Sequence, residues 1–129
     1  MKLSRRAYTA FSAGVALAIV GCGDSGVKRH ALSGSVTYQS APVPSGTIMF
    51  QPDRGKGNSG PATVAVITGG RFETPRGKGA VKGPHTVLIQ GYDGTPPTDM
   101  RPFGKPLFPD YKTEIDISSS RSDLELNVP

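Results

Sequence analysis

The sequence predicts an all-β domain: a seven-stranded antiparallel β-sandwich that follows an N-terminal export segment. Three observations predict it. Segments in which apolar and polar side chains alternate recur at short intervals after residue 30. The 129 residues include 17 glycines and 12 prolines, which interrupt helices. No stretch after residue 30 has the 3.6-residue period of an amphipathic helix. Short strands joined by turns and packed as two sheets account for all three observations.

The first expected strand, residues 32–38, sets the pattern. Leu32, Val36 and Tyr38 fall on its apolar face. Gly34 lies on the same face, and a glycine there indicates that another chain segment approaches closely. The other expected strands follow in chain order: residues 46–51, 62–67, 71–74, 85–90, 111–117 and 123–128.

Turn residues separate these strands. Residues 39–45 contain two prolines and predict the first turn. Gly69-Gly70 predicts a tight hairpin that returns with Phe72 pointing inward. Glycine-rich loops are expected at residues 53–61 and 75–83, and a serine-rich turn at residues 118–122.

The N-terminus has the layout of an export signal. Residues 1–6 are basic, residues 10–20 are apolar, and Gly21-Cys22 follows at once. The apolar stretch is too short for a permanent membrane span, which needs about 20 residues. Two adjacent arginines, Arg5-Arg6, partly match a twin-arginine signal, so this route and the general secretory route both remain open.

The run Ile19-Val20-Gly21-Cys22 resembles a bacterial lipobox. The resemblance implies cleavage between Gly21 and Cys22 and lipidation of the Cys22 thiol, with the protein exported and lipid-anchored to the cell envelope; the alternative is an ordinary buried cysteine. Gly23, in place of an aspartate, favours the outer membrane over the inner one. The expected organisation is a signal peptide at residues 1–21, lipidated Cys22 and a flexible tether at 22–30, and the sandwich at 31–129.

Several short motifs in the mature chain resemble carboxypeptidase regulatory-like domains. They are Val36-Thr37-Tyr38, Pro42-Val43-Pro44, the strand at residues 46–50, Gly70-Arg71-Phe72 and the strand at residues 82–89. The resemblance implies a transthyretin-like (prealbumin-like), Ig-like sandwich. It implies no zinc, because the zinc ligands of carboxypeptidases belong to their catalytic domain.

The sequence offers no catalytic or metal-binding constellation. Of its two histidines, His85 alternates with Val87 and Ile89 on one strand face, which favours a structural role over a triad. The hydroxyisourate hydrolases, which share the transthyretin-like fold, end in a Tyr-Arg-Gly-Ser signature that this chain lacks. Histidine and cysteine are too few for a zinc site, and Asp93, Asp99 and Asp110 match no calcium loop. We therefore expect no enzyme activity, no metal and no cofactor.

The charge balance excludes a nucleic-acid partner. The net charge of +5 includes Lys2, Arg5 and Arg6, so cleavage after residue 21 leaves 12 basic against 10 acidic side chains, and tryptophan is absent. The basic loops at residues 54–57 and 76–79 precede no helix and are expected to be solvated hairpin loops, with a weak anionic partner as the alternative.

The segment at residues 92–109 is the candidate interaction loop. It is long for a connection in a small domain, five prolines stiffen it, and Tyr92, Phe103 and Phe108 supply apolar surface. The alternative is that Phe103 and Phe108 only cover the open end of the core. The leading hypothesis is a lipid-anchored, non-catalytic module that acts in envelope structure or protein interaction. The alternatives are a module that binds envelope polysaccharide and, third, a small hydrolase.

Overall fold

The domain is built from eight strands and one short turn of 3₁₀ helix. The structure is a computed structural model, and it describes residues 27–129. The elements are β1 (Leu32–Tyr38), β2 (Ala41–Pro42), β3 (Ser45–Pro52), η1 (Arg54–Lys56), β4 (Thr63–Thr68), β5 (Arg71–Glu73), β6 (Gly83–Tyr92), β7 (Tyr111–Ile117) and β8 (Arg121–Val128). The described residues contain no helix that is long and apolar enough to cross a membrane.

All seven strands expected from the alternation are present, and the all-β prediction is confirmed. The two-residue strand β2 was not predicted. It forms because Gln39 and Ser40 both adopt positive φ, which closes a two-residue hairpin onto the end of β1. Gly69 and Gly70, also at positive φ, make the predicted hairpin between β4 and β5.

The strands form one hydrogen-bonded sheet in the order β2-β1-β5-β4-β3-β6-β7, with β8 on the other edge of β1. The hydrogen bonds therefore do not divide the strands into the two separate sheets that the sequence predicts. The reason is β5, which pairs with β4 on one side and with β1 on the other and so joins the two halves.

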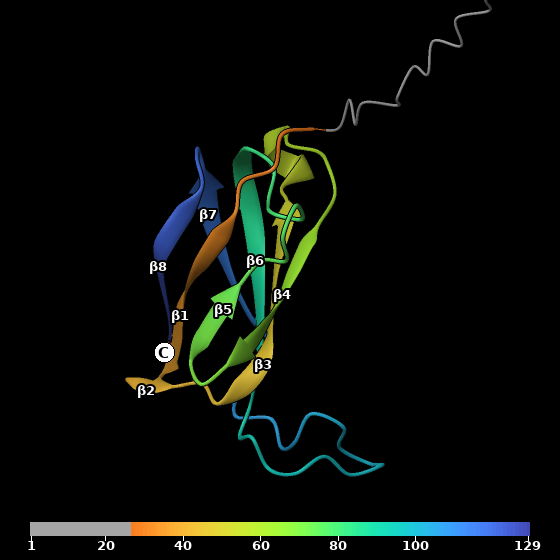
Figure 1. Cartoon of the computed structure of the whole chain (residues 1–129), viewed down its shortest axis with the longest axis vertical. Helices are drawn as coiled ribbons and strands as arrows, with labels where there is room; N and C mark the ends of the chain where they lie inside the picture. Colours follow the sequence, from red (N-terminus) through yellow and green to blue (C-terminus); the bar gives the residue numbers. More distant parts are fainter. Residues whose placement is uncertain (1–26) are drawn as a thin grey trace, which may run out of the picture.

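The last strand differs from the antiparallel prediction. Every other pairing in the sheet is antiparallel, but β8 runs parallel to β1. Residues 118–120 carry the chain from β7, at one edge of the sheet, to β8, at the other edge beside β1. The curl of the sheet brings these two edges side by side in Figure 1, so a connection of three residues is long enough.

The sheet curls around one core. Leu32, Val36, Leu124 and Val128 come from β1 and β8, and they pack in the same cluster as buried residues of the β4-β3-β6-β7 half, which are Ile48, Phe50, Ala65, Ile67, Val87, Ile89 and Ile117. Phe72 points inward as predicted, 5.8 Å from Phe50 between ring centres. Burial of these side chains is the main force that closes the curl.

The described chain begins at one end of the long axis of the domain. In Figure 1 the segment before β1, residues 27–31, lies at the top, and the long connection between β6 and β7, residues 93–110, lies at the bottom. Backbone hydrogen bonds between His30 and Ala80 fix the N-terminal segment in place. This segment and the long connection therefore mark opposite poles of the domain.

Candidate functional site

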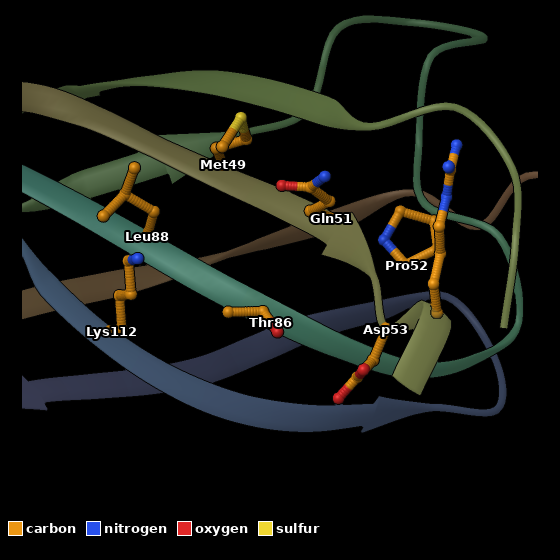
Figure 2. A pocket seen from close by; sticks show the side chains of 8 residues that line it. Met49, Gln51, Pro52, Asp53, Thr86, Leu88 and Lys112 are labelled. Carbon is orange, nitrogen blue, oxygen red and sulfur yellow. The ribbon is translucent and has the colours of Figure 1, made fainter. Parts of the chain in front are cut away.

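Two surface features can make contacts with other molecules: a hollow on the outer face of the sheet and the loop at the pole far from the N-terminal segment. The hollow has a volume of about 340 Å³ and lies over β3 and β6 (Figure 2). Antiparallel register places Met49 beside Leu88 and Gln51 beside Thr86. Leu88 in turn pairs with Lys112 of β7.

The hollow combines an apolar floor with a polar rim. Met49 and Leu88 form the floor, and Asp53, Arg54 and Lys112 bring charges of both signs to its edges. These groups can hydrogen-bond and pair charges with a bound molecule. The hollow therefore offers a surface on which another molecule can be bound.

The basic loop at residues 54–57 is partly neutralised. It contains the three residues of η1, too few for a helix N-terminus that would hold an anion. Lys56 donates to Glu114 of β7 at 2.8 Å, and this hydrogen bond raises the pKa of the lysine. The pair is exposed, so its contribution to stability is small. Of the two cations in this loop, Arg54 is the one that lines the hollow.

The loop at residues 93–110 lies at the pole of the domain opposite the N-terminal segment (Figure 1), and we call it the polar finger for this position. It is held by hydrogen bonds along its base. The backbone amide of Leu107 donates to the carbonyl of Gly91 at 3.0 Å, and the backbone amide of Asp93 donates to the carbonyl of Lys105 at 2.9 Å. At the tip, Thr98 and Arg101 exchange two backbone hydrogen bonds around a tight turn. The finger is therefore an ordered extension of β6.

One carboxylate joins the two arms of the polar finger. Asp93 Oδ1 accepts hydrogen bonds from the Thr95 amide at 3.0 Å, from the Thr95 hydroxyl at 2.8 Å and from the Lys105 amide at 3.1 Å. The bonds from Thr95, and then the one from Lys105, lower the pKa of Asp93 below its ordinary value of 3.8, because they favour the ionised form.

The three aromatic residues predicted as an interaction surface are not brought together. Phe108 packs against Tyr38 of β1, with ring centres 4.8 Å apart, and adds to the core. Tyr92 and Phe103 pair outside, at 5.7 Å. Phe103 is 58% exposed. Phe108 thus follows the alternative in which the loop covers the core, while Phe103 stays on the surface.

Sequence reasoning missed the most exposed apolar residue of the finger. Met100, in the turn at the tip, is 90% exposed. A methionine in a polar, proline-rich loop is a signal that could have identified it. Together with Phe103, it gives the finger an apolar tip at the pole opposite the N-terminal segment.

His85 is buried, as its alternation with Val87 and Ile89 predicts. Its Nδ1 lies 2.8 Å from the Gly83 carbonyl, which requires a proton on Nδ1, and its Nε2 has no hydrogen-bond partner among the described residues. Ile115 is the register partner of His85, so the neighbouring Glu114 and Asp116 project from the other side of the sheet. Neither ring nitrogen of His85 hydrogen-bonds to a carboxylate of the described residues.

The described residues contain no group of three or more histidine, cysteine, aspartate or glutamate side chains that could hold a metal ion. Asp93 Oδ1 is engaged within the finger, and Asp110 accepts from Gln90 Nε2 at 3.2 Å. The predicted cleavage and lipidation positions, Gly21 and Cys22, lie outside the described residues. Comparison with protein-family models, with curated proteins and with solved structures finds no match.

The Asp93 contacts predict a pH-dependent finger. Because the folded pKa is lowered, the stabilisation is fully present above the ordinary aspartate value and is lost as the pH falls through the folded pKa. We expect Asp93→Asn at neutral pH to speed amide hydrogen exchange at Thr95 and Lys105, and acid to lower the protection of the same two amides, relative to their intrinsic exchange rates, in the wild type. Asp99→Asn is the control, since the Asp99 side chain makes no hydrogen bond within residues 27–129. Unchanged exchange in Asp93→Asn would contradict the assignment.

Proposed function

We propose that the protein is an exported, lipid-anchored and non-catalytic β-sandwich module that makes protein contacts in the cell envelope. The observation that carries this proposal is the N-terminal pattern, in which a basic and an apolar segment lead directly to Ile19-Val20-Gly21-Cys22. Cys22 is the sole cysteine of the chain, so lipidation leaves no thiol for a disulfide. Gly23 favours the outer membrane.

The curled sheet with its common core supports a domain of the carboxypeptidase regulatory-like, transthyretin-like kind. A non-catalytic module of this kind acts by binding a partner on its surface. The polar finger supplies one, because its exposed tip is held by backbone hydrogen bonds and by Asp93 before any partner arrives. Preorganisation of this kind lowers the entropy cost of binding.

The arrangement of the poles fits an anchored adaptor. The described chain begins at one pole, and Met100 and Phe103 lie at the other. Lipid on Cys22 therefore holds the domain at the membrane with the finger directed away from it. Several acyl chains give durable attachment, since each buried methylene contributes about 0.8 kcal/mol.

Fractionation and crosslinking of intact envelopes test both parts of the proposal. We expect the wild type to partition into detergent and to crosslink to at least one envelope protein. Cys22→Ser removes the acyl acceptor, so the variant is expected to leave the membrane fraction. Phe103→Ser keeps the anchor and is expected to remain in the membrane while its crosslinked products fall at least fivefold.

Two outcomes would contradict this function. A wild type that stays in water after phase separation would exclude the lipid anchor. Crosslinked products that contain polysaccharide instead of protein, and that depend on Phe103, would replace protein contacts by glycan binding.

A further inference from the structure

The outer face of β4, β3 and β6 carries an apolar patch that the finger does not explain. Antiparallel register aligns Val64, Met49 and Leu88 in one row across the three strands. Val66 lies in the next row, beside Thr47. The side chains of Val64 and Val66 are 51% and 66% exposed. We call Met49, Val64, Val66 and Leu88 the outer patch.

Val64 and Val66 face outward because the other side of β4 fills the core. Thr63, Ala65 and Ile67 are buried there. A half-buried strand ordinarily shows polar side chains to solvent, so an outward pair of valines next to Met49 and Leu88 indicates a contact surface. Aromatic side chains, which sugars stack on, do not contribute to the patch. Its aliphatic composition fits another protein surface.

We propose that the outer patch binds the outer patch of a second copy of this chain, face to face, around a two-fold axis that runs parallel to the strands between β3 and β6. Such an axis keeps the N-terminal segments of both copies at the same pole, so two copies anchored in one membrane can pair side by side. An axis across the strands would place these segments at opposite ends of the dimer. The choice of axis, but not the patch, rests on the proposed lipid anchor.

The side chains around the patch fit this symmetry. Met49 of one copy faces Leu88 of the other. Lys112, at the β7 end of the row, lies over β4 of the other copy, whose outward residues Val64, Val66 and Thr68 are uncharged, so Lys112 meets no other cation there. Asp53 and Arg54 follow β3 at one end of the patch. The axis keeps them at equal height, and each copy thus offers both a carboxylate and a guanidinium to the other.

The size of the face indicates a weak dimer. Strands lie about 4.8 Å apart and rise about 3.3 Å per residue, so four strands of about six residues span roughly 400 Å² in projection. A standard stable interface takes about 800 Å² from each partner. Pairing in dilute solution is therefore expected to be weak, and confinement of both copies to one membrane raises their effective concentration.

Thiol crosslinking of the full chain in isolated membranes tests the proposal. Chains with Met49→Cys and chains with Leu88→Cys are produced in the same cells, and the membranes are then treated with a short bismaleimide, because sheets packed face to face lie about 10 Å apart and a direct disulfide needs α-carbons within about 7 Å. We expect the mixture to give at least fivefold more covalent dimer than Glu125→Cys, which places a thiol on β8 in the other half of the sheet. Wild-type chains, whose single thiol is Cys22, measure the background. Covalent dimer in that sample would show that Cys22 has a free thiol, which would contradict the lipid anchor but not the pairing of the outer patches.

A charge-exchange pair separates pairing from folding. Val64→Lys, in the chains that carry the cysteines, places a cation against Lys112 of the other copy and is expected to reduce the crosslink at least fivefold. Adding Lys112→Glu to the same chains is expected to restore it, which a merely unfolded protein could not do. Equal crosslinking by Glu125→Cys, or no dimer from the Met49→Cys and Leu88→Cys mixture, would overturn the proposal.

Discussion

Gly34→Ala is expected to destabilise the domain by about 3 kcal/mol. A β-carbon added at Gly34 would lie 2.0 Å from the carbonyl oxygen of Leu124 and 2.8 Å from its β-carbon. Both atoms belong to β8, the strand that pairs with β1 at this point. The strands would have to separate where they are hydrogen-bonded. The entropy gained by replacing glycine, about 0.4–1 kcal/mol, is too small to offset that cost.

Urea unfolding followed by circular dichroism measures the effect. Gly55→Ala is the matched control, because a β-carbon there meets only the Asp53 side chain, at 3.2 Å, on an exposed loop that can adjust. Its stability is expected to stay within about 0.5 kcal/mol of the wild type. An unchanged midpoint for Gly34→Ala would show that β1 and β8 do not pair in this register.

Phe50→Ala is the second large effect, with an expected loss of about 4 kcal/mol. The Phe50 side chain is fully buried in β3, and its ring meets that of Phe72 from β5. Removing it leaves a cavity between the two halves of the curl. No disulfide of the described domain can compensate, since the only cysteine is Cys22. Total stabilities of small domains are about 5–15 kcal/mol, so much of the margin would be lost.

Phe103→Ala provides the comparison for the same chemical change on the surface. Phe103 touches Tyr92 but is largely exposed, and its removal is expected to cost about 1 kcal/mol or less. Thermal unfolding of both variants measures the difference. Equal losses from the two substitutions would contradict the placement of Phe50 at the centre of the core.

Alternation along the chain was sufficient to locate the strands but not always to orient them. Gly34 interrupts an otherwise regular apolar face, and the close approach that this predicts is confirmed by Leu124. In β4, by contrast, both faces carry apolar residues, so the sequence does not reveal that Val64 and Val66 face outward. The pattern along one strand cannot show which face the rest of the sheet covers.

Long-range pairing explains the remaining differences. The parallel pairing of β8 with β1 depends on where the chain crosses after β7, and no local residue specifies that. The hydrogen bonds that hold the polar finger are only partly local. Asp93 and Thr95 form a turn that the sequence suggests, but the Lys105 amide reaches the same oxygen from 12 residues away. Burial of Phe108 likewise depends on Tyr38, far along the chain.

The pairing of β1 with β8 also constrains how the molecule is made. These two strands lie at the beginning and near the end of the described chain, so one edge of β1 can pair with β2 and β5 early, while its other edge lacks a neighbour until β8 has been synthesised. Contacts this distant in sequence form slowly. Closure of the domain along the β1–β8 edge is therefore the step that waits until synthesis has reached Val128.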